Sequence, residues 1–139
     1  MLIIDSNIWA YYFDEDASEH SSVTEHVNTI LKTEKIAINT TIIIEVAHFL
    51  IKNLGSVLGK RKLQLFLSFS FTIIDLNYDL TLRAIDLLIK YSYTGLGGRG
   101  ATILAIAETL NINEIMTHDT AFKRVDWLRV IDPVSNGNL

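Results

Sequence analysis

The chain alternates between short apolar runs and longer stretches in which apolar residues recur at helical spacing. Short, continuous runs rich in isoleucine are typical of strands that are buried on both faces of a parallel sheet. Such runs lie at residues 2–5, 35–39, 71–75, 114–117 and 128–131. The pattern therefore predicts five strands, most of them joined by connections long enough to hold helices.

Helical spacing is clear between these strands, where apolar residues three and four positions apart form stripes typical of core-facing helices. The two clearest stripes are Val23, Val27, Ile30 and Leu31, and Leu80, Ala84, Leu87 and Leu88. Helices are also predicted at residues 41–53, 60–68 and 101–110, the last apolar nearly all round, as expected of a central helix. Alternating strands and helices predict an α/β fold, a three-layer α/β/α sandwich with a short central parallel sheet.

The domain organisation follows from the lack of interruptions in this pattern. No internal repeat or low-complexity linker appears, and the single proline, Pro133, follows the last apolar run. We therefore expect one domain over residues 1–133 and a short tail over residues 134–139. A chain of 139 residues with 49% apolar and 20% charged residues has the size and composition of one globular domain.

Composition also narrows the chemistry and the compartment. The chain has no cysteine, which excludes disulfides and thiol catalysis and fits a reducing compartment. Glu45, His48 and Lys52 interrupt the longest apolar stretch, so no membrane span is predicted. The opening residues, Met-Leu-Ile-Ile-Asp, lack the basic segment of a signal peptide, and we expect a cytoplasmic protein.

Three acidic residues are candidates for a common site. Asp5 ends the first predicted strand and Asp119 lies just past the fourth, and ligands of open parallel sheets bind beyond the carboxyl ends of the strands. Glu45 is the only charge in residues 42–47, where an unpaired carboxylate is costly to bury. Taken singly, each aspartate could cap the following helix, and Glu45 could pair with a core lysine or a backbone amide. Taken together, the three predict a site for Mg²⁺ or Mn²⁺, which can activate a water and clamp a phosphodiester.

These segments also resemble a known family. Residues 2–7 (Leu-Ile-Ile-Asp-Ser-Asn), the helix that carries Glu45, and residues 115–122 (Ile-Met-Thr-His-Asp-Thr-Ala-Phe) are similar to the PIN domain, in particular to VapC-type toxins of toxin–antitoxin pairs. The resemblance extends from residue 1 to about residue 133. It implies a Mg²⁺- or Mn²⁺-dependent endoribonuclease, usually homodimeric, that is neutralised by a small antitoxin inserting a peptide segment into the acidic groove.

The resemblance assigns roles to individual residues. It implies that Asp5, Glu45 and Asp119 are the catalytic residues and the metal ligands. It further implies that Asn7 and Thr117 are polar residues that support these acids.

One acid of the family pattern is absent. The pattern reads Arg-Asp-Ala where this chain has Arg99-Gly100-Ala101, so Gly100 stands at an expected aspartate. Glu108 does not replace it, because eight residues along a helix span about 12 Å. The loss predicts weaker metal binding and low or no activity. Either a substitution that disarms a toxic nuclease or a natural, catalytically degenerate family member explains Gly100.

Positive charge is local in this sequence. The net charge is −4, from 12 basic and 16 acidic residues, so the surface as a whole does not attract nucleic acid. Arg99, Lys123 and Arg124 flank the predicted acidic site in sequence and are candidates for contacts to phosphate. An RNA substrate would depend on such local charges and on a bound cation.

Alternative functions remain open at this point. A PIN-fold binding module for RNA or an antitoxin, without catalysis, is consistent with Gly100. Residues 95–100 (Gly-Leu-Gly-Gly-Arg-Gly) match the dinucleotide-binding pattern G-x-G-x-x-G, but no strand is predicted directly before them, so this alternative is disfavoured. Glu45 and His48 spell the Glu-x-x-His of di-iron helices, but the second copy that such a site needs is missing.

Overall fold

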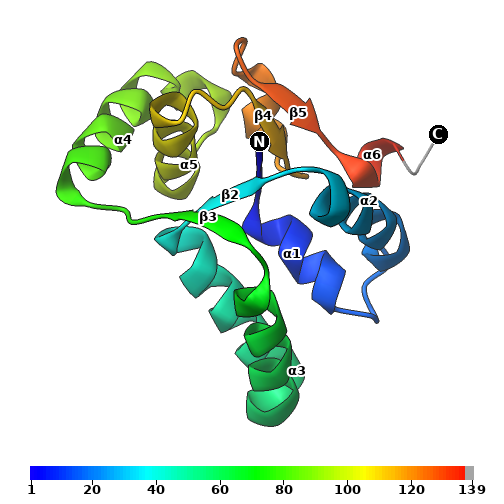
Figure 1. The fold of residues 1–139 in the computed structure, drawn as a ribbon. Coiled ribbons are helices and arrows are strands. Elements are labelled where there is room, and N and C mark those ends of the chain that lie inside the picture. The colour runs from blue at the N-terminus through cyan, green and yellow to red at the C-terminus, as the bar shows by residue number, and fades with distance from the viewer. Residues whose placement is uncertain (137–139) are drawn as a thin grey trace.

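The computed structural model describes residues 1–136 and has a five-stranded sheet between two layers of helices (Figure 1). The sheet order is β3-β2-β1-β4-β5, and every neighbouring pair is parallel. The strands are β1 (Leu2–Ile4), β2 (Ile36–Asn39), β3 (Phe71–Ile74), β4 (Glu114–Met116) and β5 (Arg129–Ile131). The predicted α/β sandwich with a short parallel sheet is confirmed, and each predicted strand is present.

The central strand β1 positions the candidate site. Its residue Ile3 aligns with Ala37 of β2 on one side and with Ile115 of β4 on the other. All three residues of β1 are buried, because helices cover both faces of the sheet. The strand order reverses direction between β1 and β4, and such a switch point leaves a crevice beyond the carboxyl ends of the two strands.

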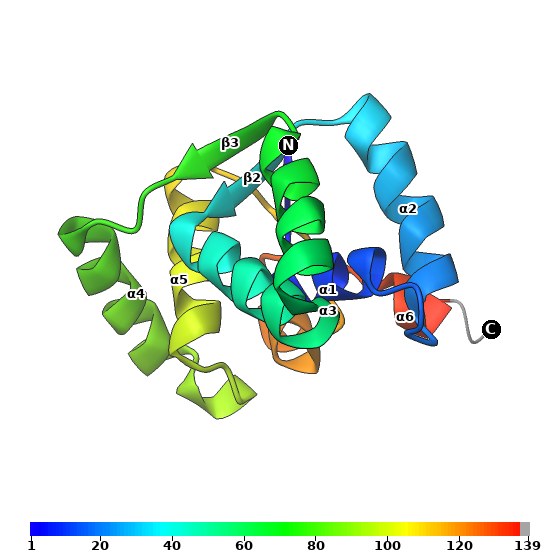
Figure 2. The ribbon, with the colours of Figure 1, turned by 90° about the horizontal axis from the view of Figure 1, so that it is seen from below.

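Helices cover the two faces of the sheet unequally. Figures 1 and 2 show α4 and α5 on one side and α1, α2 and α3 on the other. As predicted for a central helix, α5 is buried over most of its length and contacts β2, and α4 packs on α5. The helices are α1 (Ser6–Phe13), α2 (His20–Thr33), α3 (Thr40–Ser68), α4 (Tyr78–Lys90), α5 (Gly98–Thr109) and the short α6 (Pro133–Asn136). Two short 3-10 helices are η1 (Ser92–Thr94) and η2 (Thr120–Arg124).

The last short helix, α6, lies in the region predicted as a tail. It begins at Pro133 and packs against α2. The remaining predicted tail residues, 137–139, lie outside the described residues.

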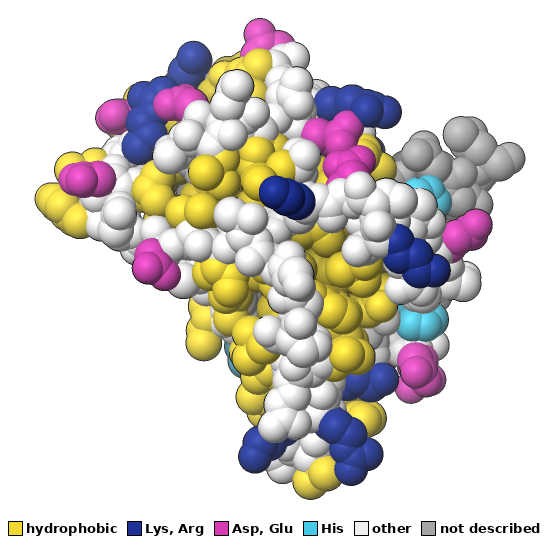
Figure 3. Space-filling model, viewed as in Figure 1, with side chains coloured by type: hydrophobic (Ala, Val, Ile, Leu, Met, Phe, Trp, Pro, Cys, Tyr) yellow, Lys and Arg dark blue, Asp and Glu magenta, His cyan; other side chains and the backbone are white. Residues whose placement is uncertain are grey.

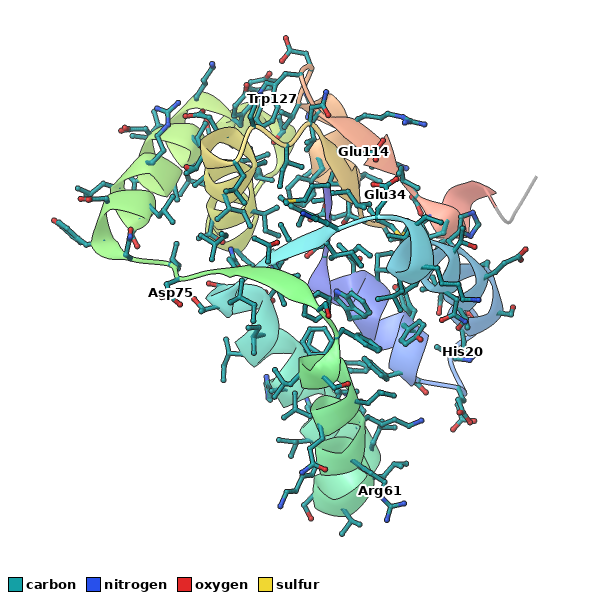
Figure 4. All side chains as sticks on the ribbon, in the orientation of Figure 1. His20, Glu34, Arg61, Asp75, Glu114 and Trp127 are labelled. Atoms are coloured by element: carbon teal, nitrogen blue, oxygen red, sulfur yellow. The ribbon has the colours of Figure 1, made fainter. Side chains whose placement is uncertain are left out.

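Helix α3 consists of two arms that meet at Gly55. This residue has a φ of +84°, a backbone conformation that favours glycine, and it interrupts the helix. The second arm folds back closely on the first, since a Cβ atom at Gly59 would lie 2.6 Å from the carbonyl oxygen of Leu50. The two arms project from the body of the molecule, with Arg61 near their outer end (Figure 4). The separate helices predicted at residues 41–53 and 60–68 correspond to these arms.

The arms of α3 expose apolar surface. By length and composition α3 could cross a membrane, with a mean hydropathy of 1.5 over its most apolar window. The turn at Gly55, however, divides it into arms that are each shorter than the roughly 20 residues of a span. Apolar side chains cover much of the visible face of the arms (Figure 3). The exposed ones are Ile44, Ile51, Val57, Leu58, Leu65 and Leu67.

An aromatic cluster joins the base of these arms to the sheet. Trp9 of α1 is fully buried, and its ring centroid lies 5.1 Å from that of Phe66 and 5.4 Å from that of Phe71. Phe13 is also buried in this cluster, whereas Tyr11 and Tyr12 are half-buried. The packing fixes the start of α1, and therefore Asp5, relative to β1.

Candidate active site

Asp5 lies at the carboxyl end of β1, at the switch point of the sheet, and its side chain is fully buried. Its Oδ1 atom accepts a hydrogen bond from the backbone N–H of Ser6 at 2.7 Å and so caps α1. Its Oδ2 atom accepts a hydrogen bond from the hydroxyl of Thr117 at 2.8 Å. The aspartate is therefore both the helix cap that the sequence allowed and a buried charge that faces other polar groups.

Thr117 connects Asp5 to the segment that follows β4. Its hydroxyl accepts hydrogen bonds from the Nδ2 atom of Asn7 at 3.3 Å and from the backbone N–H of Asp119 at 3.0 Å. The Oδ1 atom of Asn7 in turn accepts from the backbone N–H of His118 at 3.3 Å. Asn7 and Thr117 thus join the ends of β1 and β4, and they orient two of the three candidate acids.

Arg99 of α5 is the group on which the three acids converge. Its Nη1 atom lies 2.6 Å from Oδ1 of Asp5, and its Nε atom lies 3.4 Å from Oε2 of Glu45. Its Nη2 atom lies 3.8 Å from Oδ2 of Asp119. A single guanidinium therefore contacts carboxylates from the end of β1, from α3 and from the end of β4. Sequence reasoning placed Arg99 beside the site as a phosphate contact, but the structure places it between the acids.

Burial and charge perturb the groups of this cluster. Burial raises the pKa of the Glu45 carboxyl, the positive charge of Arg99 opposes this rise, and the charge of Asp5 adds to it. For Arg99, burial lowers the pKa, but the charge and hydrogen bond of Asp5 and the charges of Glu45 and Asp119 together raise it above the ordinary value. Arg99 is thus held in its charged form. Asp119 also caps η2, since its Oδ1 atom accepts from the N–H of Ala121 at 3.0 Å.

The donor set fits a divalent cation in its chemistry. Asp5, Glu45 and Asp119 supply carboxylate oxygens, the ligands that Mg²⁺ and Mn²⁺ favour, and Oε1 of Glu45 is buried with no hydrogen-bond partner in the described part of the chain. In their present arrangement, however, no three acidic or histidine side chains among residues 1–136 enclose a space for a metal ion. The guanidinium of Arg99 contacts all three carboxylates instead.

The surroundings of Gly100 leave no space for a side chain. The glycine is buried at the start of α5, and a Cβ atom there would lie 2.5 Å from Cδ1 of Leu96 and 3.3 Å from the ring of Phe122. Leu96 is itself buried, so its apolar side chain fills the space that an aspartate would enter. Glu108, at the other end of α5, pairs with Arg83 and not with the acidic cluster.

The other two predicted phosphate contacts have partners elsewhere. The Nζ atom of Lys123 lies 2.9 Å from Oδ2 of Asp132. The Nη1 atom of Arg124 donates to the carbonyl oxygen of Tyr93 at 2.8 Å, and its Cζ atom lies over the Tyr93 ring, 5.5 Å from the ring centroid. Of the three basic candidates, Arg99 is the one that contacts the acids.

Asp132 is a buried acid that the sequence analysis missed. It follows β5 directly and accepts hydrogen bonds from Lys123 and from the backbone N–H of Val134, and it lies 3.0 Å from Nδ1 of His118. The signal that revealed Asp5, an acid directly after a predicted strand, was present here too. Asp132 extends the polar edge of the sheet to a third strand.

A hollow of about 360 Å³ opens beside the acidic cluster. Glu45 and Arg99 line it, so a ligand in the hollow would meet the cluster directly. Its walls are Ser6, Asn7, Ala10, Tyr11, Glu45, Phe49 and Arg99. The glycine-rich segment 95–100 directly follows α4 and η1 and not a strand, which removes the structural context of a dinucleotide site.

Comparison with known proteins identifies the family. The PIN domain model matches residues 2–128, and the chain therefore belongs to the PIN domain family, which confirms the resemblance seen in the sequence. PIN domains are typically nucleases and generally use divalent metal ions. A comparison with curated proteins gave no match.

Several solved toxin structures share the fold. VapC20 of Mycobacterium tuberculosis, described as a sarcin–ricin loop cleaving toxin, has a TM-score of 0.78 and 15% identity, over 90% of this chain and 95% of that one. VapBC2 from Rickettsia felis, bound to a DNA fragment from its promoter, has a TM-score of 0.72 and 23% identity, over 94% and 96%. A toxin–antitoxin complex from Klebsiella pneumoniae has a TM-score of 0.73 and 23% identity, over 96% and 98%.

Proposed function

We propose that this chain is a VapC-like toxin that cleaves RNA with a divalent cation, Mg²⁺ or Mn²⁺, held by Asp5, Glu45 and Asp119, and that Gly100 lowers or abolishes this activity. The observation that carries the proposal is the convergence of these acids, from separate elements, at the switch point of a PIN-family sheet. The similarity to VapC20, a sarcin–ricin loop cleaving toxin, supports RNA as the substrate class. When bound, the cation would supply an activated water and neutralise phosphate charge.

The residues of this chain have defined tasks in that proposal. Thr117 and Asn7 hold Asp5 and Asp119 in place through the hydrogen bonds at the ends of β1 and β4. Glu45 and Arg99 face the hollow, where an RNA strand would have access to them. Arg99 can bind phosphate oxygens in the two-pronged manner of guanidinium groups once it leaves the acids.

Restoring the missing acid tests the proposal. We expect Gly100→Asp to raise Mn²⁺-dependent cleavage of labelled RNA by on the order of tenfold or more, since a fourth carboxylate strengthens cation binding. Gly100→Asn is the matched control, because it displaces Leu96 equally but adds no charge. Both variants are compared with and without a chelator, after circular dichroism confirms their folding. A folded, Mn²⁺-loaded Gly100→Asp protein that cleaves no RNA contradicts the proposal.

A second candidate function rests on Gly100 and Arg99. Leu96 fills the space of the missing acid, and Arg99 neutralises part of the remaining acidic charge, which favours a PIN-fold module that binds RNA or an antitoxin without cleaving. Fluorescence anisotropy with labelled RNA separates the two candidates. The module would bind RNA without turnover, and Gly100→Asp would leave it unable to cleave.

The proposal extends to partners. The solved relatives include toxin–antitoxin complexes, which supports an antitoxin as the protein partner of this chain. The exposed apolar residues Leu82, Ile85 and Ile89 lie on α4 at helical spacing and support a homodimer. As the sequence suggests, we place this toxin in the cytoplasm.

A further inference from the structure

The acidic cluster already contains a cation that belongs to the protein. Arg99 donates hydrogen bonds to both carboxylate oxygens of Asp5, from Nη1 at 2.6 Å and from Nη2 at 3.5 Å. Its guanidinium also lies 3.4 Å from Glu45 and 3.8 Å from Asp119, and its side chain is 29% exposed. The other basic candidates, Lys123 and Arg124, pair with Asp132 and with the carbonyl of Tyr93. Among residues 1–136, Arg99 is therefore the one basic side chain that forms ion pairs with these three acids.

A guanidinium and a metal ion cannot share this position. Carboxylate ligands lie about 2.0–2.1 Å from a bound Mg²⁺, so an ion would occupy the centre of the three acids. The guanidinium of Arg99 already contacts all three acids there, with Nη1 2.6 Å from Oδ1 of Asp5, Nε 3.4 Å from Oε2 of Glu45 and Nη2 3.8 Å from Oδ2 of Asp119. Binding of the ion consequently requires the guanidinium to leave, and the adjacent hollow, which Arg99 lines, offers space for it.

The charge of the cluster allows a divalent ion to replace the Arg99 guanidinium. Three carboxylates share one guanidinium, so the cluster is short of positive charge, and Oε1 of Glu45 is buried with no hydrogen-bond partner among residues 1–136. A divalent ion neutralises more of this charge than Arg99 does and provides a partner for that oxygen. Against this gain stands the loss of the ion pairs of Arg99, which weakens the net affinity for the ion.

We propose that the Arg99 guanidinium is the resident cation of the Asp5–Glu45–Asp119 cluster, and that it competes with divalent ions for that position. The proposal rests on the cation site of the proposed function and deepens it. It makes residue 99 a determinant of cation affinity, without requiring that the chain cleave any substrate.

Mn²⁺ binding measured by isothermal titration calorimetry tests this competition. Arg99→Met removes the charge and keeps an unbranched stem, and Arg99→Lys keeps a charge that cannot contact three acids in the same way. We expect Arg99→Met to bind Mn²⁺ about tenfold more tightly than the unaltered chain, a coupling of ordinary size for competing ligands. Arg99→Lys should fall between the two. Arg83→Met is the matched control, because it removes an arginine from the Glu108 pair and leaves the cluster intact.

Thermal unfolding provides the second measurement. Without Mn²⁺ we expect Arg99→Met to unfold at a lower temperature than the unaltered chain, and saturating Mn²⁺ should raise its midpoint by more than that of the unaltered chain. If Arg99→Met folds only when Mn²⁺ is present, that result supports the replacement of the guanidinium by the ion. The Mn²⁺ affinity of Arg99→Lys is then the one compared with that of the unaltered chain.

Two results overturn the competition. One is an equal or weaker Mn²⁺ affinity of both Arg99 variants, and the other is the absence of Mn²⁺ binding by any of the four proteins. RNA cleavage is judged separately, on Gly100→Asp. If Arg99→Met binds Mn²⁺ more tightly but Gly100→Asp never cuts RNA, the nuclease is contradicted and the competition stands. If RNA is cleaved but the Mn²⁺ affinity is the same in the unaltered chain and in both Arg99 variants, the competition is contradicted and the nuclease stands.

Discussion

The two ends of helix α5 carry the same chemistry in different surroundings. At its start, Arg99 meets three carboxylates, of which that of Asp5 is fully buried. Near its end, Glu108 receives two hydrogen bonds from Arg83, at 2.6 and 2.7 Å, but these side chains are 43% and 45% exposed. The exposed pair has the better geometry, yet solvent screens it, whereas removing one partner of a buried ion pair leaves an uncompensated charge. We therefore expect burial, more than hydrogen-bond geometry, to decide which arginine contributes more to the free energy of unfolding.

The largest effect should come from removing Arg99. Without divalent ions, we expect Arg99→Met to lower the free energy of unfolding by about 3 kcal/mol, because the buried carboxylate of Asp5 loses its counterion. Arg83→Met should lower it by less than about 1 kcal/mol. Urea unfolding at low ionic strength measures both. Equal losses in the two variants would mean that burial does not distinguish the two ends of α5.

A smaller effect tests how tightly the buried end is packed. Gly100→Ala places a methyl group against Leu96, a clash of about 1–3 kcal/mol that outweighs the roughly 1 kcal/mol gained in helix propensity. Leu96→Ala alone leaves a cavity and also destabilises the protein.

The double variant completes the test. Because the alanine at residue 96 makes room for the methyl at residue 100, the combined loss should be smaller than the sum by about 1 kcal/mol, measured as a double-mutant cycle in urea. Additive losses would show that Leu96 does not restrict residue 100.

The sequence predicts the positions of the acids well, for a physical reason. Short buried strands have a distinctive apolar pattern, and the carboxyl ends of parallel strands lie on one edge of a sheet. Asp5 and Asp119 can therefore be placed together from the apolar pattern alone. Asp132 obeys the same rule after β5 and escapes notice, because it lies beside the single proline, where the pattern predicts the start of a tail.

The role of Arg99 could not be predicted in this way. Its position at the start of α5 is evident from the sequence, but the direction of a long, flexible side chain depends on the charges around it in space. Those charges come from β1, α3 and the end of β4, which only the fold brings together. The packing of Leu96 against Gly100 could not be predicted either, because it depends on the fold. The sequence shows that an acid is missing at residue 100, but it does not show which apolar side chain fills that space.

The smallest effect concerns the exposed pair at the end of α5. The hydrogen bond from Arg83 lowers the pKa of Glu108 below its ordinary value of 4.5. A carboxyl group with a lowered pKa in the folded state stabilises the protein above the unfolded pKa, and this contribution is lost as the pH falls through the folded pKa. Glu108→Gln should therefore reduce stability by less than about 1 kcal/mol at neutral pH, and the difference should shrink once the pH is well below 4.5.

Salt gives this last prediction a second, independent check. Exposed charges are screened over about 3 Å at 1 M ionic strength, so the difference between the unaltered chain and Glu108→Gln should also shrink in 1 M NaCl at pH 7. The loss caused by Arg99→Met should persist there to a larger extent, because Asp5 is buried and salt screens buried charges less. The two ends of α5 are distinguished by how far each ion pair lies from solvent. If 1 M NaCl reduced the stability losses of Arg99→Met and Glu108→Gln by the same fraction, that distinction would be contradicted.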